Sequence, residues 1–186
     1  MATLKIVYEP NPCLHKKAQE VLNDDESSKN ILNDMVKTLG TLNGIGLAAP
    51  QVNIGKRLVV IDLRGVDDYD ENHKVKEGDK KLFKMINPVI TNFSDNKLSM
   101  NEGCLSLPSI RANIIRPKEL DLEFYDENFN LCKIHADGLL AKCIQHEIDH
   151  LNGITMINYM SPLKRDVAIR KIKKIVKIIE DEENVD

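Results

Sequence analysis

The segment Gln145-His146-Glu147-Ile148-Asp149-His150 constrains this chain most, because it predicts a helix with metal ligands on one face. Residues four apart lie about 40° apart around an α-helix, so His146 and His150 can offer imidazole nitrogens to one ion. Glu147 lies about 100° around the helix from His146 and could reach a water on that ion without being a ligand. The motif is short, however, and also occurs by chance in unrelated helices.

The residues around this motif place the two histidines on the inward side of the helix. They form two adjacent stripes at helical spacing, one of Leu139, Cys143, His146 and His150 and one of Leu140, Ile144 and Leu151. Because a buried histidine without a partner is costly, these stripes favour a metal site over chance.

Two histidines leave such a site short of a ligand, and the downstream sequence does not supply a third. Met156 stands where a further histidine would be expected, and Glu180 follows a lysine-rich stretch typical of a solvated helix end. Upstream, Glu102-Gly103-Cys104-Leu105-Ser106 offers the thiolate of Cys104. One thiolate and two imidazoles leave a fourth coordination position open, which is typical of a catalytic rather than a structural site.

Three sequence blocks, in this order, resemble the signature motifs of the peptide deformylases. They are Gly44-Ile45-Gly46-Leu47-Ala48-Ala49-Pro50-Gln51, Glu102-Gly103-Cys104-Leu105-Ser106 and Gln145-His146-Glu147-Ile148-Asp149-His150. The similarity continues through Ile86-Asn87-Pro88, Ala136-Asp137-Gly138-Leu139-Leu140 and Tyr159-Met160-Ser161-Pro162-Leu163-Lys164. It therefore covers nearly the whole chain, apart from a charged insert at residues 64–81.

The resemblance implies an enzyme that removes the N-formyl group from formyl-methionine at the start of nascent polypeptides and releases formate. Its divalent ion would be held by Cys104, His146 and His150. The resemblance implies Fe²⁺ in the cell, with Zn²⁺, Ni²⁺ or Co²⁺ in purified protein, although a Cys/His/His set alone would suggest zinc. Such an ion lowers the pKa of a water toward ~7. Glu147 would then act as general base and acid.

The resemblance also implies the groups that contact the substrate. The side chain of Gln51 and the backbone N–H of Leu105 would donate to the developing oxyanion. The substrate-binding positions would be Gly44, Ile45, Gly46, Glu102, Gly103, Arg111, Leu139 and Cys143. Lys142 is a departure, since many relatives have an aliphatic residue there, and its stem could either cover the pocket rim or face solvent. Glu102 could pair with Arg116 and brace the loop of Cys104, or form an ordinary surface ion pair.

Two other classes of function share parts of this pattern. A zinc metallopeptidase that cleaves peptide bonds would need the histidine pair and Glu147 but neither Cys104 nor Gln51. A metal-binding protein without catalytic activity is disfavoured, because every catalytic position of the family is filled.

The length of 186 residues and a hydrophobic fraction of 42% suit one catalytic domain over residues 1–186. We expect a helix over residues 27–43 capped by Ser27 or Ser28, strands at 58–63 and at 82–90 with Pro88 at an end or edge, and a hairpin over 120–135. Asp137 would cap the metal helix and Asn152-Gly153 would end it. The fold class is therefore α+β, with antiparallel sheets around a central metal-binding helix and one helix toward each terminus.

The insert at residues 64–81 carries eleven charges in eighteen positions, which predicts a solvated loop or a hairpin extension without a function. Cys13, Cys104, Cys132 and Cys143 are scattered, which favours a reducing compartment over a disulfide framework. No apolar run approaches the ~18 residues of a membrane span. We expect a cytoplasmic protein with neither DNA nor a membrane as partner.

The last predicted helix starts at Ser161-Pro162 and carries an apolar stripe of Leu163, Val167, Ile172, Val176 and Ile179. Residues 161–180 hold seven basic and two acidic side chains. Their net charge is +5, whereas the net charge of the whole chain is −3. Charge alone predicts a solvated amphipathic helix, whereas the resemblance implies a contact with ribosomal RNA. The acidic residues between 181 and 186 would oppose that contact.

Overall fold

The structure is a computed structural model that describes residues 2–22, 26–66, 68–70, 73–74 and 76–183. Its helices are α1 (Glu26–Thr41), α2 (Gly138–Leu151) and α3 (Pro162–Glu183), with four 3-10 helices: η1 (Pro12–His15), η2 (Ala49–Val52), η3 (Glu77–Asp79) and η4 (Met156–Tyr159). The strands are β1 (Gly46–Ala48), β2 (Leu58–Asp62), β3 (Asp68–Asp70), β4 (His73–Lys74), β5 (Leu82–Phe93), β6 (Lys97–Cys104), β7 (Leu107–Pro117), β8 (Glu119–Tyr125) and β9 (Leu131–Asp137). The expected α+β class is confirmed, with antiparallel sheets, a central helix and one helix toward each terminus.

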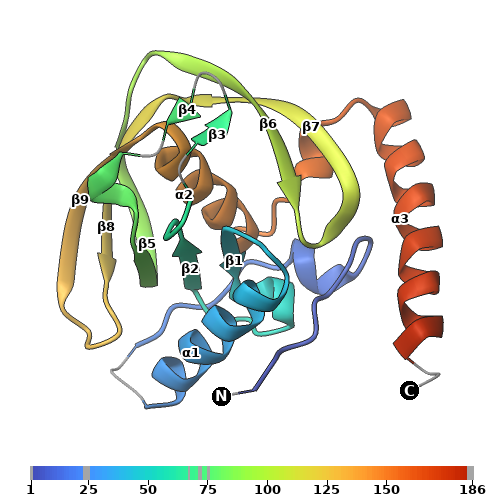
Figure 1. Ribbon diagram of the computed structural model, residues 1–186, viewed down its shortest axis with the longest axis horizontal. Coiled ribbons are helices and arrows are strands. Elements are labelled where there is room, and N and C mark those ends of the chain that lie inside the picture. Colours follow the sequence, from blue (N-terminus) through green and yellow to red (C-terminus); the bar gives the residue numbers. More distant parts are fainter. Residues whose placement is uncertain (1, 23–25, 67, 71–72, 75, 184–186) are drawn as a thin grey trace.

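All strand pairs of the named sheets are antiparallel. One sheet has five strands in the order β1-β2-β5-β8-β9, and β3-β4 and β6-β7 form two-stranded sheets. Figure 1 shows α2 enclosed between the larger sheet and the long β6–β7 hairpin, which arches over it. The site of interest therefore lies where the end of β6 meets α2, inside the molecule.

The core forms because apolar residues alternate along the strands and recur at helical spacing on α1 and α2. On α2, eleven of fourteen residues are buried, and its apolar side packs on the larger sheet. Leu32, Met35 and Leu39 of α1 pack on the other side of β1 and β2. A third cluster joins Leu107 and Ile114 of β7 to Ile172 of α3.

The start of α1 differs from the prediction. The helix begins at Glu26, so Ser27 and Ser28 lie in its first turn instead of capping it. Both hydroxyl groups accept hydrogen bonds from the Lys56 ammonium, at 3.2 and 3.4 Å. Residues 23–25, where a cap would stand, lie outside the described residues.

The position predicted for Pro88 is wrong. Pro88 lies inside β5, which pairs with β2 on one edge and β8 on the other. The register with β8 shifts between Ile86 and Val89, and Asn87 adopts a positive φ of 51°. A bulge at this point accommodates a residue that has no backbone N–H to donate. The Asn87 side chain also bonds both backbone groups of Val21, which holds the bulge in place.

The charged insert contains the β3–β4 hairpin and η3, although residues 67, 71–72 and 75 lie outside the described residues. Lys76 forms an ion pair with Asp137, directly before α2. Asp137 occupies the predicted N-cap position, but its carboxylate makes no capping hydrogen bond and pairs with the insert instead. The predicted end of α2 is confirmed, with Asn152 as C-cap and Gly153 at a φ of 75°.

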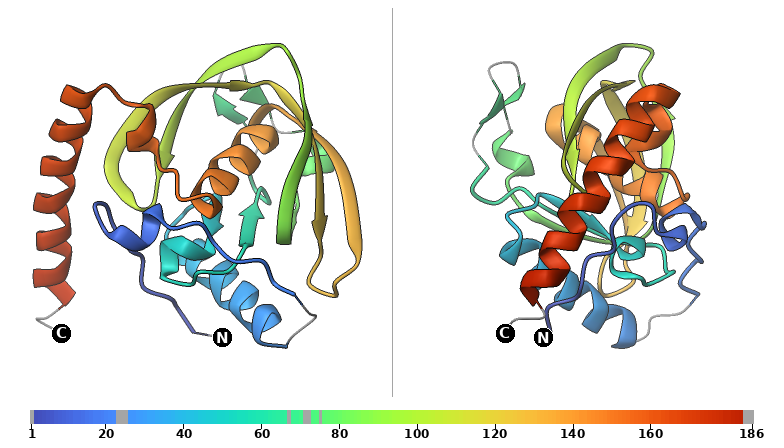
Figure 2. Two further views of the ribbon diagram at one scale, coloured as in Figure 1. Left: turned by 180° about the vertical axis from the view of Figure 1, so that it is seen from behind. Right: turned by 90° about the vertical axis from the view of Figure 1, so that its right-hand side faces the viewer.

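The third helix lies along one side of the molecule, next to β7 (Figures 1 and 2). Its predicted apolar stripe is partly wrong, because Leu163 and Val167 are 73% and 53% exposed. The residues of α3 that pack in one cluster with β7 and η4 are Ile169, Ile172 and Val176, which are spaced by three and four and lie on one face of the helix. Leu163 and Val167 are not part of this cluster. No helix in the described part of the chain is both long and apolar enough for a membrane span.

Candidate metal centre

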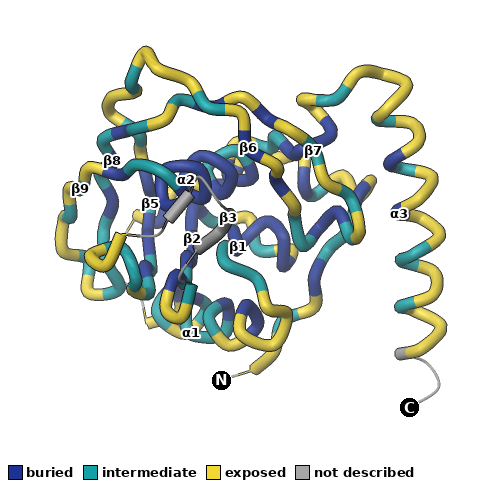
Figure 3. The backbone as a smooth tube through the Cα atoms, turned by 45° about the horizontal axis from the view of Figure 1, so that its top comes forward, coloured by how far each residue is buried: buried dark blue, intermediate teal, exposed yellow. Residues whose placement is uncertain are grey.

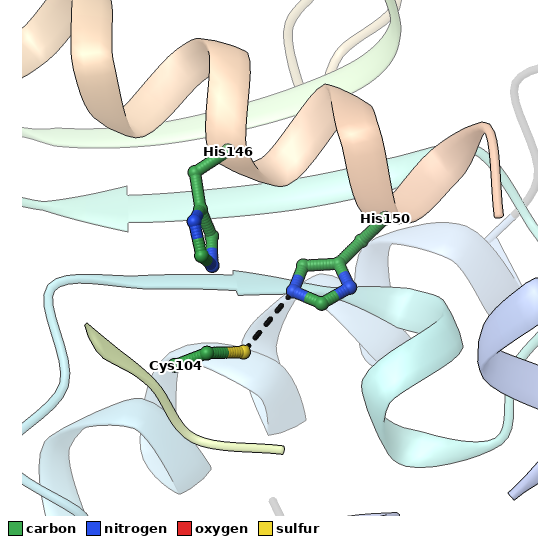
Figure 4. A group of neighbouring side chains, drawn as sticks. All are labelled: Cys104, His146 and His150. Carbon is green, nitrogen blue, oxygen red and sulfur yellow. Dashed lines mark hydrogen bonds between the residues drawn. The ribbon is translucent and has the colours of Figure 1, made fainter. Parts of the chain in front are cut away.

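The structure brings Cys104, His146 and His150 together, as predicted. Cys104 is the last residue of β6, and the two histidines lie one turn apart on α2. One ligand atom from each lies within 4.8 Å of the other two, and Cys104 Sγ is 3.2 Å from His150 Nε2. Figure 4 shows the thiol and both imidazole rings directed to the same point. Sequence spacing alone could not place Cys104 there, because 42 residues separate it from His146.

The donor set and its surroundings fit a divalent transition metal. One sulfur and two imidazole nitrogens are ligands that zinc, iron and related ions share. His146 Nδ1 is 2.9 Å from Glu102 Oε2, a hydrogen bond that leaves the other ring nitrogen for an ion. Burial lowers the pKa of His150 well below its usual value, which keeps this imidazole neutral, as a ligand must be.

Behind His146, the structure confirms the predicted pair of Glu102 and Arg116 and extends it. Arg116 Nε and a terminal guanidinium nitrogen donate to the two Glu102 oxygens at 2.6 and 3.1 Å. The other terminal nitrogen donates to Asp149 at 2.8 Å, and the Tyr159 hydroxyl donates to the same Asp149 oxygen at 2.7 Å. Burial would raise the pKa of Glu102, but the bonds from His146 and Arg116 outweigh it and lower this pKa to about 2. Glu102 is thus an anion that fixes the orientation of His146.

Asp149 and Tyr159 were not singled out from the sequence. Asp149 stands between the two histidines in the motif and points to the outer side of the site, so its position in the motif was the available signal. Nothing in the sequence pairs Tyr159 with it. The structure explains both, because a buried guanidinium needs acceptors for its remaining N–H groups.

Glu147 has the environment of a proton-transfer group. Its side chain is buried, and Oε2 has no hydrogen-bond partner in the described part of the chain. Burial raises the pKa of Glu147 to about 7. Gly46 makes this placement feasible, because a Cβ at that position would overlap the Glu147 carboxylate. A carboxyl group that titrates near neutrality can both accept and release a proton.

Gln51 is held beside the cysteine. Its Oε1 accepts from the Ala48 backbone N–H at 2.8 Å, which directs Nε2 toward Cys104 Sγ at 3.4 Å and Ser106 Oγ at 3.3 Å. Leu105 follows Cys104 and, like Gln51, lines a cavity beside the cysteine. An amide N–H fixed in this way is a donor oriented before any ligand arrives. Ser106 had no predicted role, although it ends the second signature block.

The cavity beside these groups has a volume of about 400 Å³. Of the predicted site residues, it is lined by Gly44, Ile45, Gly46, Gln51, Gly103, Cys104, Leu105, Arg111, Cys143, His146 and Glu147. Leu139 and Glu102 are not among the lining residues, because Leu139 packs in the core and Glu102 lies behind His146. Further lining residues are Asn43, Leu107, Ser109, Ile110 and Lys142. Lys142 is buried and does not face solvent.

Comparison with known proteins relates this chain to one family. The sequence model described as "Polypeptide deformylase" matches residues 3–166. The chain is 39% identical to the peptide deformylase of Maricaulis maris over 177 residues, which cover 95% of this chain and 96% of the relative. It is 42% identical to that of a Wolbachia from Drosophila simulans over 177 residues, 95% and 98% of the two chains.

Solved structures agree in fold. A peptide deformylase from Ehrlichia chaffeensis superposes with a TM-score of 0.83 at 40% identity, over 93% of this chain and 96% of that chain. One from Legionella pneumophila gives a TM-score of 0.84 at 36% identity, over 96% and 98% of the two chains. The likeness therefore extends across the sheets and helices that position the metal centre.

Proposed function

The chain belongs to the polypeptide deformylase family, and we propose that Cys104, His146 and His150 hold the divalent ion with which it works. The enzyme is a metal-dependent hydrolase that removes the N-formyl group from nascent polypeptides. The observation that carries the assignment of ligands is the convergence of Cys104 Sγ and two imidazoles within 4.8 Å, beside the buried carboxylate of Glu147. The zinc metallopeptidase alternative is not favoured, since such an enzyme has no need for Cys104 or Gln51.

We propose ferrous iron as the ion in the cell, with Zn²⁺, Ni²⁺ or Co²⁺ replacing it in purified protein. When bound, the ion supplies Lewis acidity, which lowers the pKa of water toward ~7 and polarises a carbonyl group. The mixed sulfur and nitrogen donors suit each of these ions, so the ligands alone do not select one. Purification without oxygen, followed by metal analysis and turnover per metal, separates them, and full activity with zinc alone would contradict the iron assignment.

Glu147 takes a proton from the attacking water and delivers it to the departing amine nitrogen. Glu147 Oε2 is available for a hydrogen bond to this water, because it is buried and has no partner among the described residues. One proton of the water reaches the nitrogen through Glu147 as the C–N bond breaks, and the second, lost by formic acid at neutral pH, protonates the released amine. The products are therefore formate and an N-terminal ammonium group, and one water is consumed. A carboxyl with a pKa of about 7 suits both steps at neutral pH.

Gln51 Nε2 and the Leu105 backbone N–H stabilise the negative charge that develops on the formyl oxygen. Gln51 is suited to this because the Ala48 N–H fixes its other end. Removing one such donor typically costs about two to three decades in rate. Its present acceptors, the Cys104 sulfur and the Ser106 hydroxyl at 3.4 and 3.3 Å, are long contacts that a stronger acceptor can replace.

The methionine side chain occupies the cavity of about 400 Å³ that Ile45 and Cys143 line. Gly44, Gly46 and Gly103 allow the substrate backbone to approach, and Arg111 contacts that backbone at the cavity edge. Leu139 supports Cys143 from the core, and Glu102 supports His146. The whole chain acts as a single catalytic domain, and the insert at residues 64–81 takes no part in the reaction.

The decisive experiment is to measure formate release from a formyl-methionyl peptide and, in parallel, cleavage of an internal peptide bond. Formate without internal cleavage is the expected result, and internal cleavage without formate would overturn the proposal. Actinonin, with which the Ehrlichia chaffeensis enzyme forms a complex in a solved structure, offers a second probe of this chain. We expect it to compete with the formyl peptide.

We also propose that the protein is cytoplasmic and that exposed cations of α3 contact ribosomal RNA close to where its substrate emerges. Arg170, Lys173 and Lys174 are exposed on this helix. Their replacement by glutamate should weaken co-sedimentation with ribosomes most at low salt, because phosphate neutralisation releases counterions. Equal sedimentation of both proteins at every salt concentration would contradict the contact.

A further inference from the structure

A groove of about 750 Å³ runs between β7 and α3, outside the catalytic cavity. Ser109, Ile110 and Arg111 line both the groove and the cavity, so the two hollows meet along this stretch of β7. Figure 1 shows the arrangement, with α3 standing beside the outer side of the β6–β7 hairpin. A ligand that leaves the catalytic cavity across Arg111 therefore enters the groove.

The walls of the groove combine apolar and basic side chains. Leu163 and Val167 are apolar and more than half exposed, whereas Arg111, Lys164 and Lys171 are basic. None of the lining residues is acidic. Exposed leucine and valine side chains that are not used for docking α3 are thus placed beside three cations, which favours a ligand that carries both apolar groups and carboxylates.

The groove also borders a strand edge. Among the described residues, β7 pairs with β6 alone, so its other edge carries backbone groups without a strand partner. Consecutive residues 109–113 line the groove, and within it Lys171 Nζ of α3 donates to one backbone group of this strand, the Ser109 carbonyl, at 3.0 Å. An open edge accepts an extended peptide through main-chain hydrogen bonds, with little dependence on its sequence.

We propose that this groove binds the downstream part of the formylated nascent chain and prefers segments with acidic and apolar side chains. The inference rests on the proposed function, because it takes the formyl-methionyl chain as the substrate. A cavity of about 400 Å³ has the size of a small-molecule site, so a longer chain must leave it. Continuity along Ser109 to Arg111 directs that chain into the groove.

The test compares kcat/KM for three substrates: the tripeptide formyl-Met-Ala-Ser, and two longer peptides that start in the same way. One continues with alternating leucine and glutamate, the other with alternating leucine and lysine. For the natural sequence we expect the acidic peptide to exceed the basic one by about threefold to tenfold, mainly through KM, as expected for a few exposed ion pairs. The tripeptide is the internal reference for each protein.

Two variants with equal changes of charge on the same helix locate the effect. Lys164→Glu with Lys171→Glu acts inside the groove and should invert the preference between the longer peptides. Arg170→Glu with Lys174→Glu acts on residues that do not line it and should keep the preference. A third variant, Val167→Trp, fills the groove without changing charge and should raise KM for both longer peptides relative to the tripeptide.

Two outcomes would contradict peptide binding in the groove. One is that both longer peptides have the same kcat/KM as the tripeptide. The other is that the two charge variants have equal effects, which would indicate that the overall electrostatic field of α3 acts on the peptide. If Lys164→Glu with Lys171→Glu keeps the peptide preference but loses ribosome co-sedimentation, the groove serves RNA and the inference fails. Absence of formate from the tripeptide in the natural protein would instead contradict the proposed function, so the two failures are distinguishable.

Discussion

The helices α2 and α3 both carry charged side chains, but they stand in opposite environments. Figure 3 shows α2 almost wholly buried, whereas α3 is buried only at Ala168 and Ile172 among its described residues. On α2, polar side chains have defined partners: His146 bonds to Glu102, and Asp149 accepts from Arg116 and Tyr159. On α3, the cations are spread over solvated turns. We therefore expect large effects from single substitutions on α2 and small, salt-dependent effects on α3.

The largest expected effect is that of Glu147→Ala. This change removes only the proton-transfer group, so formate release should fall about 10²–10⁴-fold while the ion is retained. Metal content and turnover are measured on the same sample, with Cys104→Ala as the matched control that loses the ion itself. Near-normal turnover of Glu147→Ala would show that α2 does not supply the base.

Arg116→Met sharpens the comparison through stability. It leaves the buried Glu102 carboxylate with only His146 and removes a partner of Asp149, so the free energy of unfolding should fall by about 3–5 kcal/mol. Arg170→Met on α3 makes the same chemical change at an exposed position and should stay within about 0.5 kcal/mol. Urea unfolding at a fixed metal concentration measures both, and similar losses would contradict the contrast.

The sequence could predict those features that depend on residues close together in the chain. Local patterns predicted the fold class, the ends of α2 and the convergence of Cys104, His146 and His150. The patterns behind that convergence are the helical spacing of the two histidines and the signature block around Cys104. Those patterns are local because a helix and a ligand motif are set by nearby residues. The pair of Glu102 and Arg116 was predicted as one of two alternatives, and the structure decided between them.

What the sequence could not predict depends on contacts between distant segments. Asp137 pairs with Lys76 of the insert and therefore does not cap α2, and Pro88 sits in a bulge fixed by Val21. Leu163 and Val167 were wrongly predicted on the docked stripe of α3, where Ile172 and Val176 were predicted correctly. All four residues are apolar, and only packing on β7 decides which of them face inward. Leu139 packs in the core and is not among the residues that line the cavity, so its part in the substrate site stays a prediction.

A smaller effect is expected from Cys143→Trp. The residue is buried and lines the catalytic cavity, so the larger ring should occupy the space of the methionine side chain. Loss of the buried methionine side chain is worth about 1.5–3 kcal/mol of binding, which corresponds to a rise in KM of about 10- to 160-fold, with metal content unchanged. Ile178→Trp on α3, at an exposed position outside the cavity, is the control. An unchanged KM for Cys143→Trp would remove this residue from the pocket wall.

The smallest expected effect tests whether the apolar face of α3 around Ile172 holds this helix on β7. Ile172 is fully buried against Leu107 and Ile114, so Ile172→Val should lower the free energy of unfolding by about 0.5–1.5 kcal/mol. In a chain of this length, that is a loss of a few degrees in Tm, on the order of 2–4 °C per kcal/mol. Ile178→Val removes the same methylene group from a side chain that is 57% exposed and should leave Tm unchanged. Amide hydrogen exchange should show faster opening of α3 in Ile172→Val and no change in α2, since the two helices pack in different clusters. If both helices open together, α3 is not an independently docked element, and the contrast between the two helices would be one of exposure only.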